Sequence, residues 1–162
     1  MDTIELLTTS EAETQAVGRQ LATALRGEER IGLAGELGAG KTCLVRGLAV
    51  GLGIPAEQVR SPSFPIVLPY EGGRLPLFHI DLFRLPAADI DSFSLREYIY
   101  GFGVCAIEWY ERLDEPMSDF LEISLHFSGA DERRLVVTAH GSGYDSALKV
   151  LHELSQRSGA KL

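Results

Sequence analysis

The amino-acid sequence predicts an α/β fold in which helices flank a mixed sheet of parallel and antiparallel strands, giving a three-layer sandwich. Two observations support this class. Segments with helical spacing of apolar residues alternate along the chain with short apolar runs that are typical of buried strands. In addition, two pairs of such runs flank the turn sequences EGG, at 71–73, and SGADE, at 128–132, and hairpins of this kind add antiparallel strands to a sheet.

The start of the chain has a clear helix signal. Residues 3–7 alternate weakly and form a candidate edge strand. Ser10 and Glu13 then have the form of a capping box, in which a hydroxyl and a carboxylate satisfy the first free amides of a helix. The sequence therefore predicts a helix from Glu11 to Leu25, ended by Gly27.

The other elements are predicted from the same two periodicities. Strands are expected at 30–34, 64–70, 74–81, 103–109, 121–127 and 135–139. Helices are expected at 44–52, 89–100 and 144–154. Three prolines in the first hairpin, at 65, 69 and 76, restrict its pairing to edge or irregular strands.

The size and composition of the chain fit an ordinary soluble protein. A chain of 162 residues suffices for one core, so we expect a single domain spanning residues 1–162. Apolar residues make up 45% and charged residues 23% of the chain. The acidic start, MDTIELLTTSEAET, lacks the basic residues and the continuous apolar run of an export signal. We therefore expect a cytoplasmic protein.

Charge and cysteine content exclude two kinds of site. The net charge of −8 disfavours a large direct contact with nucleic acid, because such contacts depend on Lys and Arg side chains that meet phosphates. Any role in nucleic-acid metabolism would then operate through a protein partner. Cys43 and Cys105 are the only cysteines and lack the spacing of metal ligands, so no zinc site is expected.

A glycine-rich loop lies between the strand at 30–34 and the helix that follows it. Its sequence, GELGAGKT at 35–42, matches the phosphate-binding pattern G-x-x-x-x-G-K-[ST] in the strand-to-helix context that this pattern requires. The glycines let successive backbone amides face an anion, Lys41 reaches the terminal phosphates, and Thr42 can ligate magnesium. A chance match in such a chain has odds of roughly one in a few hundred. The sequence therefore predicts a P-loop NTPase-like fold.

Phosphoryl transfer also needs a second acid, for the metal or its waters, and a group that orients the attacking oxygen. Two predicted strands end in acids, at Asp81 and Glu108, and either carboxylate could hold the metal. His79 lies on the same strand face as Asp81, so it could orient that carboxylate or be a structural histidine. The residues alone leave these assignments open.

The sequence also limits the nucleotide. Guanine-reading P-loop proteins usually carry an Asn-Lys-x-Asp element, and this chain contains no asparagine, so ATP is expected. Ser63, in the segment RSPSF, lies where nucleotide switches often place a hydroxyl that senses the terminal phosphate. A proline-containing turn capped by serines explains the same residues equally well.

The ordered motifs GELGAGKT, SPSF, HIDLFRL, REY and IEW resemble the TsaE (YjeE) family, small bacterial P-loop ATPases required for making threonylcarbamoyladenosine beside the anticodon of certain tRNAs. The resemblance spans about Ser10 to Trp109. Two departures are Ser63 in place of the usual Thr and Phe83 in place of the usual Tyr. The resemblance implies a weak, magnesium-dependent ATPase, stimulated by its partners, whose cycle supports the TsaD and TsaB subunits. It also implies that tRNA is met only indirectly, through that complex.

The resemblance assigns roles to individual residues. Lys41 neutralises the phosphates, and Thr42 and Glu108 hold magnesium. Asp81 is an essential acid near the terminal phosphate, where it could orient water. Trp109 lies beside the nucleotide or at a partner surface, and the capped start of the first helix approaches the adenine. The candidate nucleotide-binding residues are Ser10, Gly35, Glu36, Leu37, Gly38, Ala39, Gly40, Lys41, Thr42, Cys43, Ser63 and Trp109.

Two other functions remain open at this point. A nucleotide-dependent assembly switch with incidental hydrolysis would carry the same motifs. A small-molecule kinase would need an acceptor-binding lid or an Arg cluster, which the sequence does not reveal. Residues 107–122 carry six acids and one base, and they could face a partner or form a solvated surface loop.

Overall fold

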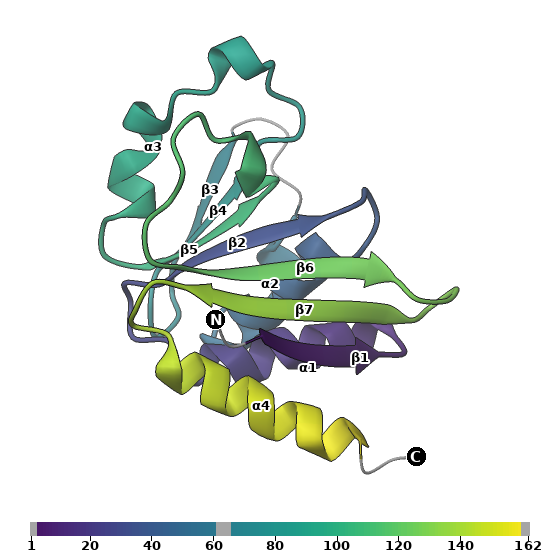
Figure 1. Ribbon diagram of the computed structural model, residues 1–162. Helices are drawn as coiled ribbons and strands as arrows, with labels where there is room; N and C mark the ends of the chain where they lie inside the picture. The colour runs from purple at the N-terminus through teal and green to yellow at the C-terminus, as the bar shows by residue number, and fades with distance from the viewer. Residues whose placement is uncertain (1–2, 61–65, 160–162) are drawn as a thin grey trace.

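The computed structural model describes residues 3–60 and 66–159 of the chain. Its centre is a seven-stranded sheet with the order β1-β7-β6-β2-β5-β4-β3 (Figure 1). The strands are β1 (Thr3–Thr8), β2 (Arg30–Gly35), β3 (Val67–Tyr70), β4 (Leu77–Asp81), β5 (Val104–Glu108), β6 (Phe120–Phe127) and β7 (Arg133–His140). The helices are α1 (Glu11–Ala22), α2 (Lys41–Gly51), α3 (Ser92–Ile99) and α4 (Asp145–Gly159). The short 3₁₀ helices are η1 (Ala56–Gln58), η2 (Ala87–Asp89) and η3 (Tyr110–Arg112).

The sheet is mixed, as the sequence predicts. β2 pairs in parallel with β5 and β6, and β4 pairs in parallel with β5. The pairs β1–β7, β6–β7 and β3–β4 are antiparallel, and the last two are the hairpins that the turn sequences predict. Because β2, β4 and β5 run in the same direction, their carboxyl ends meet at one edge of the sheet, where open α/β sheets bind ligands.

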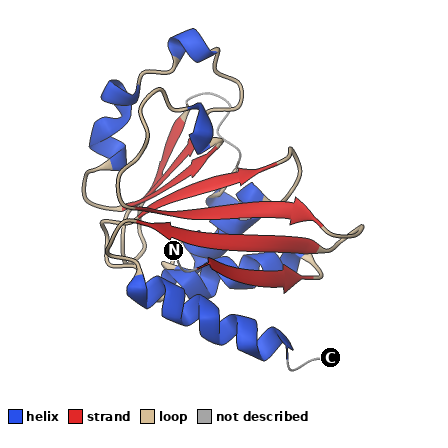
Figure 2. Ribbon diagram, viewed as in Figure 1, coloured by secondary structure: helices blue, strands red, loops and turns tan. Residues whose placement is uncertain are grey.

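Three layers form, because α1, α2 and α4 cover one face of the sheet and α3 lies against the other (Figure 2). Successive side chains of β5 point to opposite faces. Val104 and Ala106 join the core beneath α1 and α2, whereas Cys105 and Ile107 join the core on the side of α3. Among the described residues, no helix is long and apolar enough to cross a membrane.

Helices α1 and α2 approach closely because each carries a glycine at their contact. A Cβ atom on Gly47 would lie 2.0 Å from the carbonyl oxygen of Gln15, and one on Gly18 would lie 2.4 Å from that of Leu44. Only a residue without a side chain fits at either position. The contact fixes α2 against α1, and with it the loop that precedes α2.

The capping box at the start of α1 is confirmed. Ser10 Oγ accepts the Glu13 amide at 3.1 Å, and the Glu13 carboxylate accepts the Thr9 amide at 2.6 Å. The end of α1 was predicted three residues too late: the helix stops at Ala22 and not at Leu25. The next three amides bond to carbonyls three residues earlier, so the last turn is of the tighter 3₁₀ type.

The first hairpin is shorter than predicted. β3 begins at Val67 and β4 at Leu77. Pro76, immediately before β4, has no amide to offer to the sheet, which explains the later start of that strand. Residues 61–65, where the first arm was expected to begin, lie outside the described part of the chain.

Candidate functional site

The glycine-rich loop leads from the end of β2 into α2. Gly38 and Gly40 have φ angles of 81° and 110°, a region that residues with side chains rarely adopt. Gly40 is the N-cap of α2, and within the described residues no side chain caps this helix start. The first turn of α2 also contains no acid, whereas the first turn of α1 contains two. The positive end of α2 is therefore suited to an anion that comes from outside the helix.

The ammonium group of Lys41 is folded over this loop. Its Nζ donates to the carbonyl oxygens of Gly35, at 2.5 Å, and Glu36, at 3.0 Å. The residue is only 4% exposed. Burial lowers the pKa of Lys41 below its ordinary value of 10.5, although nearby carboxylates act in the opposite direction. A buried cation held by two neutral carbonyls suits a site that receives phosphate.

The structure brings together the two predicted acids and the predicted metal-binding hydroxyl. Asp81 and Glu108 are paired across β4 and β5, at the carboxyl ends of both strands. Thr42, in the first turn of α2, donates its hydroxyl to Glu108 at 3.0 Å from each carboxylate oxygen. Glu108 is 3% exposed, so these oxygens face the loop and not bulk solvent.

Asp81 has a different environment from Glu108. Its Oδ1 accepts the backbone amide of Phe83 at 3.0 Å, and its side chain is partly buried. Burial raises the pKa of Asp81, and the charge of Glu108 adds to this effect, while the Phe83 amide opposes it. A carboxylate with a raised pKa accepts a proton more readily, which is the property that a general base requires.

His79 contacts Glu108 and not Asp81, the partner that the sequence suggested. Its Nε2 lies 2.5 Å from Glu108 Oε2, and its Nδ1 lies 3.2 Å from the Tyr70 hydroxyl. The strand register explains the difference: the residue opposite His79 on β5 is Ala106, whose small side chain leaves room for Glu108 to reach back. This contact depends on pairing between strands, so the order of residues along β4 could not reveal it.

Trp109 lies against the P-loop lysine. Lys41 Nζ is 4.3 Å from the centroid of the Trp109 ring, a cation–π contact, and the Phe83 ring packs against the indole at 4.8 Å between centroids. The backbone of Trp109 has a φ of 60°, which is rare for a residue with a large side chain and is often found at functional sites. Trp109 therefore lies beside the loop, and its place beside a nucleotide or at a partner surface stays a prediction.

The remaining predicted residues differ in how close they lie to this site. Cys43 donates its thiol to the Glu11 carbonyl at 3.2 Å, so the start of α1 lies beside the first turn of α2. The Ser10 hydroxyl is used in capping α1. Leu37, at the tip of the loop, is 68% exposed. Ser63 lies outside the described residues.

Arg112, in η3, anchors the loop that follows β4, a role that the sequence analysis missed. Its guanidinium donates to the carbonyl oxygens of Phe83 and Leu85, which ties η3 to the loop that follows β4. The sequence did contain one indication of this role: Arg112 is the one basic residue among the six acids of residues 107–122. A base that stands alone in an acidic segment is a reasonable candidate for an internal anchor.

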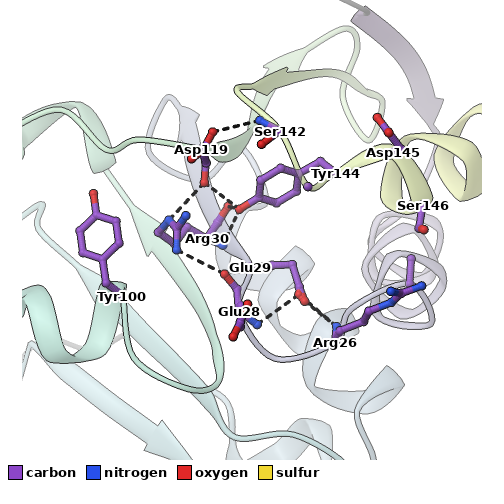
Figure 3. Close-up of a pocket in the computed structure, with 12 residues that line it drawn as sticks. Arg26, Glu28, Glu29, Arg30, Tyr100, Asp119, Ser142, Tyr144, Asp145 and Ser146 are labelled. Atoms are coloured by element: carbon purple, nitrogen blue, oxygen red, sulfur yellow. Dashed lines mark hydrogen bonds between the residues drawn. The ribbon is translucent and has the colours of Figure 1, made fainter.

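A second polar cluster lies at the opposite end of the sheet, at the amino ends of β2 and β6 (Figure 3). It lines a cavity of about 590 Å³. The Glu29 carboxylate accepts the backbone amides of residues 26–27 at 2.5–3.2 Å. The Tyr144 hydroxyl lies 2.9 Å from both the Arg30 amide and the Asp119 carbonyl oxygen. These groups satisfy one another, so the cluster has the character of a structural network.

Three comparisons with known proteins agree with one another. Residues 8–135 match the family model described as "Threonylcarbamoyl adenosine biosynthesis protein TsaE". The tRNA threonylcarbamoyladenosine biosynthesis protein TsaE of Bacillus subtilis is 37% identical over 146 residues, covering 90% of this chain and 91% of the relative. The protein of the same name from Aquifex aeolicus is 42% identical over 122 residues, covering 75% and 86%. The crystal structure of Bacillus subtilis YdiB is similar with a TM-score of 0.75 and 34% identity, covering 94% of this chain and 96% of that one.

Proposed function

The chain belongs to the TsaE family of threonylcarbamoyladenosine biosynthesis proteins, and from this membership we propose that it is a magnesium-dependent ATPase subunit of that system. One observation carries the proposal: Thr42, in the first turn of an uncapped helix, lies 3.0 Å from Glu108 at the end of β5. An ammonium, a hydroxyl and two carboxylates meet there, which is the set of groups that phosphoryl transfer requires.

The oxygens of Thr42 and Glu108 suit a magnesium ion. Mg²⁺ prefers oxygen ligands and usually takes one or two from the protein, with phosphate oxygens and water completing its shell. Among the described residues, no three His, Cys, Asp or Glu side chains gather as a complete metal cage. When bound, Mg²⁺ would supply positive charge that neutralises the phosphates.

The other residues of the site divide the remaining work. Lys41 offsets the charge that develops on the terminal phosphate, because its ammonium is already buried at the loop. Asp81 orients the attacking water and accepts its proton, since burial raises the pKa of this carboxyl. Trp109 covers the ammonium on one side and so limits the access of water.

We further propose ATP as the nucleotide and TsaD and TsaB as the partners. The chain has no asparagine for a guanine-reading element. In the acidic segment, Glu108 and Glu122 are turned inward, toward Thr42 and Tyr110, so the six acids do not form one surface. Glu111 is exposed next to the site and is available to a protein partner. Contact with tRNA would then occur only through the assembled complex.

Phosphate release from ATP tests this proposal. The protein is mixed with purified TsaD and TsaB, Mg²⁺ and ATP, and release is expected to depend on the partners and to be lost in Lys41→Ala. Lys149→Ala is the matched control, because Lys149 is exposed on α4, away from the loop. Phosphate release that is the same with and without the partners, or that is equal in Lys41→Ala and the wild type, would contradict the proposal.

A further inference from the structure

A line of hydrogen-bonded groups leads from the P-loop helix into the sheet. Glu108 accepts from Thr42 Oγ1 at 3.0 Å and, on its other side, lies 2.5 Å from His79 Nε2. His79 Nδ1 in turn lies 3.2 Å from the Tyr70 hydroxyl. That hydroxyl lies 3.3 Å from the backbone amide and the carbonyl oxygen of Arg60. The line crosses α2, β5, β4 and β3, and it ends on the main chain.

Burial restricts the orientation of the His79 ring. His79 is 0% exposed and Tyr70 is 5% exposed, and a buried polar group is costly unless it is hydrogen-bonded. A carboxylate can only accept, so His79 Nε2 carries the hydrogen in its contact with Glu108. With Nδ1 meeting Tyr70, both ring nitrogens are used and the ring cannot turn without losing a partner.

A fully buried site of this size could be filled by a leucine, as position 77 on the same strand face is. The histidine adds a fixed donor aimed at one oxygen of Glu108. Asp81, on the same face, has its own donor in the Phe83 amide. The carboxylate that needs the hydrogen-bond donor at position 79 is therefore that of Glu108.

We propose that His79 is a positioning residue for Glu108: it holds the carboxylate toward Thr42 in the orientation that magnesium binding uses, and Tyr70 holds the His79 ring. This inference rests on the proposed function, because it takes Glu108 as a magnesium ligand. Hydrogen-bonding partners of metal-binding carboxylates commonly affect metal affinity by about 10–100-fold. The role requires no contact between His79 and the nucleotide.

Two substitutions of His79 by amide side chains that differ by one methylene group distinguish a positioning role from simple packing. The amide of His79→Gln can occupy the place of Nε2 and still donate to Glu108, whereas that of His79→Asn is too short and stays near Tyr70. Trp109, the single tryptophan, lies against Lys41, so its fluorescence is the probe chosen for nucleotide binding. ATP binding is first measured without metal, in the presence of EDTA. The fluorescence response to ATP is then measured across a Mg²⁺ titration. Thermal unfolding is recorded for each variant.

We expect His79→Asn to need about tenfold more Mg²⁺ for the half-maximal response, and His79→Gln to stay within about threefold of the wild type. Metal-free ATP binding should be equal in all three proteins. Tyr70→Phe should raise the Mg²⁺ requirement by about threefold, because the ring loses one anchor. Tyr144→Phe is the control: it removes a similarly buried hydroxyl at the other end of the sheet and should leave the Mg²⁺ requirement unchanged.

An unchanged Mg²⁺ requirement in His79→Asn would overturn the inference. So would equal losses in the Asn and Gln variants, or a parallel loss of metal-free binding, since these would indicate packing alone. If His79→Asn does not fold, Tyr70→Phe decides, and a wild-type Mg²⁺ requirement there would overturn the inference. A wild-type protein that shows no Mg²⁺-dependent response to ATP would instead contradict the proposed function, which is a distinguishable result.

Discussion

The two ends of β2 both carry charged groups, but these groups are satisfied in different ways. At the amino end, Glu29 accepts main-chain amides and Arg30 donates to main-chain carbonyls, so each charge has partners within the chain (Figure 3). At the carboxyl end, Lys41 also donates to two carbonyls, but Asp81 and Glu108 stand side by side, and burial lowers the pKa of Lys41 and raises that of Asp81. Charge with hydrogen-bonding partners in the chain stabilises a fold, whereas buried groups with shifted pKa values are often found where a ligand binds.

This difference separates stability from activity. Substitutions at the amino end should lower the free energy of unfolding and leave ATP hydrolysis intact. Substitutions at the carboxyl end should reduce hydrolysis and leave the fold intact, or even stabilise it, because functional sites commonly hold unfavourable charge.

The largest effect is expected from Lys41→Met, which removes the ammonium and keeps a side chain of similar length. Turnover should fall by about 10²–10³-fold, the range found when a donor to a developing anion is lost. The partner-dependent phosphate assay measures this loss. Turnover within about twofold of the wild type would contradict the prediction that the charged groups at the carboxyl end of β2 serve hydrolysis.

The same variant has a testable dependence on pH. Burial lowers the pKa of Lys41, so the folded protein binds this proton less tightly than the unfolded chain does. The charged side chain therefore costs stability at neutral pH, and Lys41→Met should have the higher free energy of unfolding there. The gain should shrink as the pH rises from the lowered pKa toward the ordinary value of 10.5, and denaturant unfolding across that range measures it. A stability gain of Lys41→Met that grows with pH would contradict a lowered pKa of Lys41.

A smaller loss of activity is expected from Asp81→Asn, which keeps the shape of the side chain but cannot accept a proton. Turnover should fall by about 10²-fold, the lower end of the range for a lost general base, while ATP binding persists. Asp131→Asn, in the exposed β6–β7 turn, is the control. If Asp81→Asn binds ATP and partners and still supports modification of tRNA without hydrolysis, the protein acts as an assembly switch and not through turnover.

At the amino end, Glu29→Gln should reduce stability and not activity. The carboxylate accepts main-chain amides of the 26–27 turn, and charged hydrogen bonds of this kind contribute about 1.5–3 kcal/mol. Denaturant unfolding should show a loss of that size. Glu28→Gln is the matched control, since Glu28 is adjacent and exposed. A large fall in phosphate release by Glu29→Gln would show that the two ends are not independent.

The smallest effect is expected from Tyr144→Phe. The variant leaves the Arg30 amide without its hydroxyl partner, which should cost about 1 kcal/mol of unfolding free energy. Phosphate release should be unchanged. A variant as stable as the wild type would mean that water replaces the hydroxyl in the cavity.

Much of the geometry of the candidate site could be predicted because its signals are local. A glycine-rich strand-to-helix turn specifies its own backbone, so the order of Gly40, Lys41 and Thr42 indicated a phosphate loop directly. Asp81 and Glu108 were found because each ends an apolar run, and parallel strands bring such ends together.

What escaped prediction depends on register between strands. The contact of His79 with Glu108 follows from the pairing of β4 with β5, and periodicity along one strand contains no information on that pairing. The anchoring role of Arg112 depends likewise on η3 meeting the loop after β4. Helix ends were also misjudged, since the 3₁₀ turn after Ala22 is set by local hydrogen bonds and not by Gly27.

The most direct test of the proposed ATP site is the fluorescence of Trp109 during a titration with nucleotide and Mg²⁺. The indole lies against Lys41, so a ligand that draws the ammonium toward its phosphates must change the surroundings of the ring. We predict a saturable change with ATP and with ADP, a much smaller one with GTP, and none with ATP in Lys41→Met. A flat titration of the wild-type protein with ATP would contradict the account.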